Sequence, residues 1–314
     1  MQRFIEEELS MEKIDFELLE QIADLHKIPE GAYNIRKNGA SEGRNSTESI
    51  SITTSEKGGL KIEIKDGTKN QSVHIPVIIS KSGLKEMVYN DFYVGEDCDV
   101  LIVAGCGISN CGKEDSRHDG VHTFYIGKNS KVKYVEKHYG TGDGEGGRVM
   151  NPKTVVYLEE GAKIEMDTTQ IRGIDDTIRE TVIHQKKDSE SLITERLLTH
   201  DKQRAESKMN VYLEGNNSRA RIISRSVAKG GSRQVFYPCM TGKSSCFGHV
   251  QCDSIIMDEA VISSIPAISA ENVNAQLVHE AAIGKIAGEQ ILKLQTFGLT
   301  AEEAEEQILK GFLK

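Results

Sequence analysis

Apolar and polar residues follow one pattern in the middle of the chain and another at its two ends. In residues 11–26 the apolar positions recur every three or four residues, which predicts an amphipathic helix. From residue 50 to residue 279, short alternating runs such as LKIEIK and MNVYLEG predict β-strands separated by polar turns. A helical period returns after that. We therefore predict an N-terminal helix and loop in residues 1–49, a β core in 50–279 and a helical segment in 280–314.

Local signals refine both ends of this division. Pro29 and Gly31 should end the first helix, and residues 31–49 are rich in Gly, Asn and Ser, which predicts a loop. In the C-terminal segment, EAAIGKIAGEQILKLQTF is expected to be helical, and Thr300 with Glu303 predicts a capping box that begins a second helix. The apolar stripes of these helices must be buried against the β core or against another protein.

A weak repeat marks the turns of the β core. GEDCDV, GKNSKV, EEGAKI, KDSESL and GNNSRA each place a turn before the residue that resumes a strand. Those residues are spaced by 32, 32, 28 and 28 positions: Val100, Val132, Ile164, Leu192 and Ala220. A period near 30 without helices predicts a β-solenoid whose coils stack on one another. An antiparallel sandwich, with strands every 8–12 residues, is the alternative.

Composition excludes several classes of protein. The 314 residues are 38% hydrophobic and 28% charged, which is ordinary for a folded chain. The 39 basic and 48 acidic residues give a net charge of −9, which disfavours non-specific nucleic-acid binding. No apolar run is long enough to cross a membrane, and the acidic start does not resemble a signal peptide, so we expect a cytoplasmic protein. Six cysteines in that reducing compartment are expected to bind metal, react or be buried.

Nucleotide and hydrolase motifs are not supported. Gly142, Gly144 and Gly147 form G-x-G-x-x-G, but a predicted strand follows instead of the helix that a dinucleotide site needs. We interpret this segment as a flexible acidic loop. The sequence contains neither a P-loop motif nor G-x-S-x-G.

Two groups of residues could carry chemistry. Cys106, Cys111, His118 and His122 have ligand types that suit zinc or iron, although six residues between the pairs is short for a zinc finger. One reactive cysteine with incidental neighbours is the alternative. The second group is Cys239, Cys246, His249 and Cys252. Because solenoid coils stack about 4.8 Å apart, Cys252 could meet His279 and Glu280, a mixed set suited to iron or zinc. Buried structural thiols are the alternative.

Three segments of the sequence resemble a known family. GCGISNCGKEDSRHDGVHTFYIGKNSKVKYVEKHYG, GHVQCDSIIMDEA and LVHEAAIGKIAGEQILKLQTFGLTAEEAEEQILKGF are similar to the core of SufB and SufD, the scaffold proteins of Suf iron–sulfur cluster assembly. The similarity covers residues 75–314 and is greater to SufB, in a short form. It implies a mostly β fold: a right-handed parallel β-helix between an N-terminal helical and loop segment and a C-terminal helical segment. It also implies a SufC-type ABC ATPase bound to the C-terminal segment and a homodimer of scaffolds.

The resemblance also assigns roles to individual residues. Cys252 matches the cysteine on which the family builds a nascent cluster, and His279 with Glu280 matches the His–Glu pair of that metal site. Cys106 and His118 match residues linked to sulfur acceptance, although GCGISNCG departs from the GCxAP form of longer SufB proteins. Cys246, six positions before Cys252, is a possible additional ligand. The roles of Cys98, Cys111, Cys239 and the first 75 residues are left open.

The function that follows is a scaffold and not an enzyme. A transient iron–sulfur cluster would be built at the dimer interface, driven by the partner ATPase, and passed to apo recipient proteins; the residues identify no sulfur donor. A polysaccharide-processing enzyme on a β-helix is the first alternative, but the chain has no Trp and 5% aromatic residues. The second is a zinc-stabilised β-solenoid with a structural or adaptor role, held by Cys106, Cys111, His118 and His122.

Overall fold

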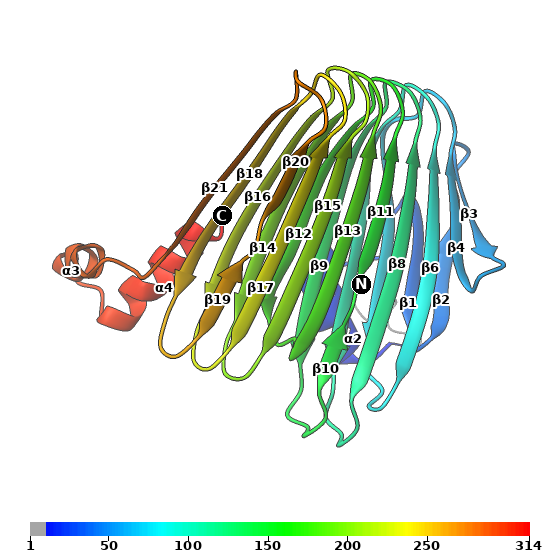
Figure 1. Cartoon of the computed structure of the whole chain (residues 1–314). Helices are drawn as coiled ribbons and strands as arrows, with labels where there is room; N and C mark the ends of the chain where they lie inside the picture. The colour runs from blue at the N-terminus through cyan, green and yellow to red at the C-terminus, as the bar shows by residue number, and fades with distance from the viewer. Residues whose placement is uncertain (1–10) are drawn as a thin grey trace.

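The computed structural model describes residues 11–314 and shows a β-solenoid in which each coil contributes to two long sheets (Figure 1). Sheet A has the order β2-β1-β5-β7-β9-β12-β14-β16-β18-β21, and sheet B the order β19-β17-β15-β13-β10-β8-β6-β4-β3. Apart from two hairpins at the N-terminal end, neighbouring strands are parallel. The prediction of a parallel β-helix is confirmed, and the antiparallel sandwich is wrong.

The strands of each sheet have these bounds. Sheet A contains β1 Ala32–Lys37, β2 Ala40–Asn45, β5 Lys69–Ile79, β7 Asp99–Ser109, β9 Lys131–Thr141, β12 Lys163–Arg172, β14 Glu190–Thr199, β16 Arg219–Ala228, β18 Phe247–Ile256 and β21 Gln276–Gly284. Sheet B contains β3 Ile50–Ser55, β4 Gly59–Ile64, β6 Lys85–Val94, β8 Ser116–Ile126, β10 Arg148–Met150, β11 Lys153–Leu158, β13 Asp176–Gln185, β15 Arg204–Leu213, β17 Arg233–Gly242, β19 Val261–Ser264 and β20 Ala267–Ala270. The helices are α2 Lys13–Ala23, α3 Gly288–Thr296 and α4 Ala301–Phe312.

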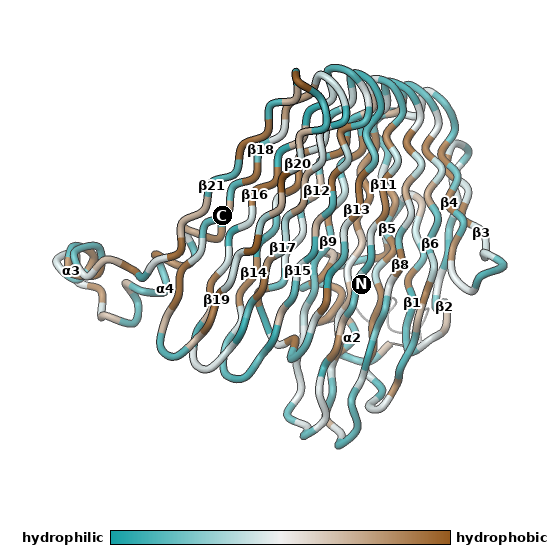
Figure 2. Tube along the Cα trace, in the orientation of Figure 1, coloured by the Kyte–Doolittle hydropathy of each residue, from teal (hydrophilic) through white to brown (hydrophobic). Residues whose placement is uncertain are grey.

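Alternating side chains fill the space between the two sheets. In β14 every second residue is buried, and the hydropathy of the chain alternates along most strands (Figure 2). Parallel register stacks like positions into columns, and one column of sheet A runs through Ile102, Tyr134, Met166, Ile193, Ile222 and Val250. Each fully buried aliphatic side chain contributes roughly 1.5–3 kcal/mol to folding, so these columns account for much of the stability.

The turns that precede the strands of sheet A confirm the repeat. A residue with positive φ stands in each one: Asp97, Asn129, Gly161, Asp188 and Asn217. Asp, Asn and Gly adopt this conformation most easily. Backbone hydrogen bonds join successive turns, as from Asp97 N to Lys128 O at 2.9 Å. One repeat position is wrong by one residue, because Ser191 and not Leu192 pairs with Ile164 and faces the core.

The N-terminal segment is more ordered than its composition indicated. Residues 31–49 were expected to form a loop, but β1 and β2 form an antiparallel hairpin, and β1 adds to sheet A beside β5. Asn38 and Gly39 form its turn, both with positive φ, which is typical of a tight hairpin. Helix α2 lies on the outer face of β7, where a Cβ atom on Gly105 would lie 2.5 Å from Ile22 O. The glycine before Cys106 therefore lets the helix approach the sheet.

The C-terminal segment departs from its prediction at its start. Residues 280–284 belong to β21 and are not helical, because they pair with Gln251–Ile255 of β18. Sheet pairing outweighs the helical propensity of the alanines there. The capping box is confirmed: Glu303 N donates to Thr300 Oγ1 at 3.2 Å, and Thr300 N donates to Glu303 Oε2 at 2.8 Å.

The glycine-rich segment is not a free loop. Gly144 N donates to Asn110 O at 3.1 Å, and Gly146 N donates to Gly112 O at 3.0 Å. A Cβ atom at either glycine would lie within 2.5 Å of backbone atoms of the loop after β7. The alternate glycines therefore allow two loops to stack. Within residues 11–314, no helix has the length and apolar character needed to cross a membrane.

Candidate functional site

The predicted cluster residues lie at the C-terminal end of the solenoid, on its last two coils. Cys252 is on β18, and His279 and Glu280 are on β21, which is the edge strand of sheet A. The register pairs Val250 with His279 and Gln251 with Glu280. Stacking of the coils therefore brings together residues 27 positions apart, as the sequence predicted.

Cys252 and His279 face the interior and contact each other. The Cys252 Sγ and His279 Nε2 atoms are 3.6 Å apart. Burial raises the pKa of the Cys252 thiol to about 11, and Glu195 and Asp253 act in the same direction, whereas the Ser264 hydroxyl opposes it. Burial also lowers the pKa of His279, against the effect of Glu280. At neutral pH the pair is a protonated thiol beside a neutral imidazole, and a metal ion would displace the thiol proton.

Glu280 lies on the opposite face of the same strand. Adjacent residues of a strand point to opposite sides, so Glu280 faces outward while His279 faces inward. Glu280 Oε1 is 3.0 Å from Nε2 of His249, which projects from β18 on that outer face. The predicted trio is thus divided into an inner Cys252–His279 pair and an outer His249–Glu280 pair.

Cys246 is not part of this group. It immediately precedes β18, about 20 Å from Cys252 at roughly 3.3 Å per residue. It occupies the small, buried position after the turn that Cys98 and Ser130 occupy in earlier coils. We therefore interpret Cys98 and Cys246 as structural residues. Cys111 is exposed in the loop after β7, and Cys239 is half-buried on the outer face of sheet B.

The residues predicted to accept sulfur meet at a second place inside the solenoid. Cys106 on β7 and His118 on β8 line one cavity of about 20 Å³, although they belong to different sheets. His118 Nδ1 is 3.1 Å from Glu86 Oε1. Burial raises the pKa of the Cys106 thiol well above its usual range, and the nearby Glu86 and Glu136 add to this effect.

A row of buried polar and charged side chains extends from this cavity toward Cys252. Glu136, on the cavity wall, pairs with Arg179 of β13. Arg179 Nε is also 3.6 Å from Oε1 of Glu195, which lies on β14 of sheet A. Ser207 and Ser224 donate to the Glu195 carboxylate at 2.8 and 3.3 Å. Register then places Ser224 beside Cys252. We call this row the internal polar track.

The charges of the internal polar track depend on one arginine. Burial opposes ionisation of Glu136, but Arg179 and His138 outweigh it and hold its pKa well below the usual range. Burial prevails at Glu195 and raises its pKa, although Arg179 acts against this. The sequence reasoning did not single out these residues. The signal was present in KVKYVEKHY, where Tyr134, Glu136 and His138 share the inward face with Val132.

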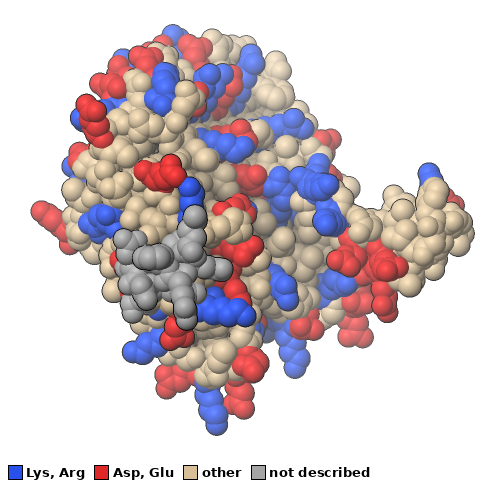
Figure 3. Space-filling view, turned by 180° about the vertical axis from the view of Figure 1, so that it is seen from behind, with Lys and Arg blue, Asp and Glu red and all other residues tan. Residues whose placement is uncertain are grey.

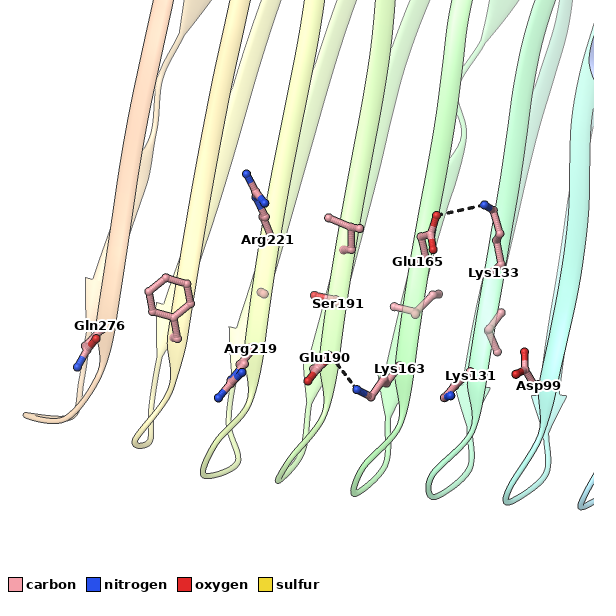
Figure 4. Close-up of a pocket in the computed structure, with 15 residues that line it drawn as sticks. Asp99, Lys131, Lys133, Lys163, Glu165, Glu190, Ser191, Arg219, Arg221 and Gln276 are labelled. Carbon is pink, nitrogen blue, oxygen red and sulfur yellow. Dashed lines mark hydrogen bonds and ion pairs between the residues drawn. The ribbon is translucent and has the colours of Figure 1, made fainter. Parts of the chain in front are cut away.

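A broad hollow of the surface lies away from Cys106 and Cys252. It is a groove of about 1000 Å³ across the first residues of β9, β12, β14 and β16 (Figure 4). Two ion pairs lie in it, Lys163 Nζ with Glu190 Oε2 at 2.9 Å and Lys133 Nζ with Glu165 Oε1 at 3.2 Å, and Arg219 and Arg221 also line it. None of the predicted site residues lines this groove.

The proposed zinc site is not assembled. Among residues 11–314, no three His, Cys, Asp or Glu side chains are grouped so that they could hold a metal ion. Cys106 is buried and Cys111 is exposed in the loop beyond β7. In the last coils too, one chain offers only pairs of ligands, Cys252 with His279 and His249 with Glu280.

Comparison with known proteins identifies the family. The SUF system FeS cluster assembly, SufBD core domain, matches residues 85–312. The chain belongs to the SufBD family. The match includes β7 with Cys106, β18 with Cys252 and β21 with His279 and Glu280. A role in iron–sulfur cluster assembly follows from this membership.

Individual SufBD proteins extend the likeness over most of the chain. An iron–sulfur cluster assembly SufBD family protein of Archaeoglobus fulgidus is 29% identical over 265 residues, which are 83% of this chain and 69% of that protein. One of Methanocaldococcus jannaschii is 29% identical over 256 residues, covering 81% and 80%. One of Pyrococcus horikoshii is 28% identical over 279 residues, covering 86% and 83%.

Proposed function

We propose that this SufBD protein is a scaffold on which a nascent iron–sulfur cluster is built between two copies of the chain. The Cys252–His279 pair at the open end of the solenoid carries the proposal. A thiol and an imidazole 3.6 Å apart are two ligands of the types that iron–sulfur clusters use. Because one chain supplies so few ligands, a second copy would complete the set. The cluster is cargo, and mixed ligation would favour its later release to apo recipient proteins.

The last coil supports pairing between two copies. β21 is the edge of sheet A, and β19 and β20 pair on one side only, with β17. Apolar residues on these strands and between β19 and β20 are exposed: Val261 41%, Ile265 51%, Ile268 48% and Val278 45%. Unpaired strand edges are ready sites for pairing with another chain. A homodimer through this end would bury the patch and enclose both Cys252–His279 pairs.

Sulfur would enter at the cavity lined by Cys106 and His118. In this proposal Cys106 accepts sulfur from a donor protein, and His118 serves the same cavity. The internal polar track then offers a polar route between Cys106 and Cys252 within the solenoid. Its serine hydroxyls and the Arg179 guanidinium would stabilise an anionic sulfur species better than an apolar core would.

The C-terminal helices suit the proposed ATPase contact. α3 stands away from the body of the molecule (Figure 1), and Leu292 on this helix and Phe297 directly after it are 62% and 73% exposed. α4 is anchored on sheet A, where Lys229 Nζ lies 2.7 Å from Glu305 Oε1. Arg225 of β16 also donates to Phe312 O at 3.3 Å. Since β16 adjoins β18, motion of these helices would reach the strand that carries Cys252.

The chain itself is proposed to be no enzyme. A SufC-type ABC ATPase would hydrolyse ATP, and its closure would shift the scaffold between two states. The proposal places the complex in the cytoplasm, where reducing conditions keep thiols free. All six cysteines of the chain are free thiols in the structure.

Anaerobic reconstitution with iron and sulfide, in the presence of the ATPase, tests this function. We expect a charge-transfer absorption band in the wild type and its loss in Cys252→Ala. Cys239→Ala, which removes a half-buried thiol on the outer face of sheet B, is the matched control and should keep the band. A full band in Cys252→Ala would contradict the assigned site.

A further inference from the structure

The outer His249–Glu280 pair has a feature that the inner pair lacks. Glu280 is the fifth of the nine residues of β21, so it stands at the centre of the edge strand. Its side chain is 60% exposed, whereas that of His249 is 18% exposed. The acid therefore projects from the surface, and the imidazole that supports it is held by the sheet.

Symmetry gives this central position a consequence. If two copies of β21 pair antiparallel over their full length, the two-fold axis passes at Glu280, and each Glu280 faces its own copy. Residues directly opposite in such a pair have Cβ atoms about 4.5–5.5 Å apart, and like charges there repel. A divalent cation between the two carboxylates would remove this repulsion. Each carboxylate would bring its His249 to the same place.

We propose that two His249–Glu280 pairs form a ferrous-iron site on the two-fold axis of the dimer. The inference rests on the dimer of the proposed function and adds His249 as a ligand. Two imidazoles and two carboxylates are borderline and hard donors, which suit Fe(II). The site lies on the outer face of β21, opposite the inner face where Cys252 meets His279. Iron and sulfur would thus be held on opposite sides of one strand before they combine.

The chain provides a matched pair for comparison. His184 Nδ1 lies 3.3 Å from Glu214 Oε1 on the outer face of sheet B. Its strand, β13, is flanked by other strands on both sides and cannot pair with a second copy. The two pairs share residue types and have similar His–Glu distances, 3.3 and 3.0 Å, and they differ in their access to a two-fold axis.

The test is anaerobic Fe(II) titration of the full chain without sulfide, in competition with a chromogenic ferrous chelator. We expect one Fe(II) per two chains, and at least tenfold weaker binding in His249→Ala and in Glu280→Gln. His184→Ala should bind as the wild type does. His249→Asn provides a second variant of similar polarity, and circular dichroism and sedimentation verify its fold and its oligomeric state.

Several outcomes would overturn the inference. They are no Fe(II) binding by the wild type, unchanged binding in His249→Ala, or equal losses in His249→Ala and His184→Ala. Reconstitution of Cys252→Ala separates this inference from the proposed function. Cys252→Ala should keep Fe(II) binding and lose the cluster. If the wild type builds no cluster while Fe(II) binding depends on His249, the scaffold function fails and the iron site stands.

Discussion

The two ends of the solenoid are finished differently. At the N-terminal end, sheet B begins with the β3–β4 hairpin, and the inward Ile50 of β3 is fully buried. At the C-terminal end, the inward Ile268 of β20 remains 48% exposed. Antiparallel hairpins close the first end, whereas the last parallel strands stop without a cover. The chain therefore covers one end itself and leaves apolar residues exposed at the other, which is the end where the proposed dimer would pair.

Charge also distinguishes the C-terminal end. Seen from behind, acidic side chains gather at the base of the C-terminal helices, and basic side chains gather over sheet A beside them (Figure 3). The first half of α4 is acidic in sequence, with Glu302, Glu303, Glu305 and Glu306. A stable fold does not require this segregation. It fits a region that meets other proteins, because complementary charge favours specific encounters.

Truncating matched isoleucines would give the largest effect on stability. Ile50→Ala removes a fully buried side chain and should lower the free energy of unfolding by about 2–5 kcal/mol. Ile268→Ala removes a half-exposed side chain and should cost the isolated chain less than about 1 kcal/mol. Urea unfolding at low protein concentration measures both. Equal losses would contradict the distinction between the two ends.

Acid should lower the free energy of unfolding through a buried histidine in the middle of the solenoid, between the two ends compared above. Burial lowers the pKa of His122 to about 4, so its imidazole is neutral in the folded state. The unfolded chain binds that proton below about pH 6.5. Stability should therefore fall by about 3 kcal/mol as the pH drops from 6.5 to 4.

Unfolding of the wild type and His122→Gln across this range checks the prediction. The variant should show a smaller loss, because one group no longer gains a proton on unfolding. Tyr134 OH lies 2.8 Å from His122 Nδ1 in the wild type, and the glutamine amide can hydrogen-bond to this hydroxyl in its place. An unchanged pH dependence would show that His122 titrates alike in both states.

A charge at the open end should separate folding from association. Ile268→Lys places an ammonium group in a position that is exposed in one chain and buried in the proposed dimer. We expect dimerisation to weaken at least tenfold, about 1.4 kcal/mol, with little change in unfolding of the monomer. Sedimentation equilibrium measures the first effect and urea unfolding the second. An unchanged dimer would move the interface away from the last coil.

Much of the fold could be predicted because its signals are local. Alternation marked the strands, and Asp, Asn or Gly in the turns marked the coils. The β1–β2 hairpin was missed because its strands are polar, even though Asn38–Gly39 is a strong turn signal. The predicted start of the last helical segment was wrong, because Glu280–Gly284 is held extended by pairing with β18. Local helix propensity does not report such a long-range contact.

The candidate site shows the same limit. The meeting of Cys252 and His279 followed from coil stacking and could be predicted. The separation of His279 from Glu280 could not, because the latter was assigned to a helix; in a strand, neighbours must point apart. Arg179 and Glu195 come from different sheets. Their pairing depends on how the sheets face each other, which the sequence pattern does not specify.

The ladder of turns sets a length scale within the molecule. Between the strands of Cys106 and Cys252 there are five steps of sheet A, β7 to β9, β12, β14, β16 and β18. At about 4.8 Å per step this is roughly 24 Å. Insertion or deletion of part of a coil would disturb the register, whereas a whole coil would preserve it. The distance between the Cys106 and Cys252 thiols can therefore change only by whole coils, in steps of about 4.8 Å.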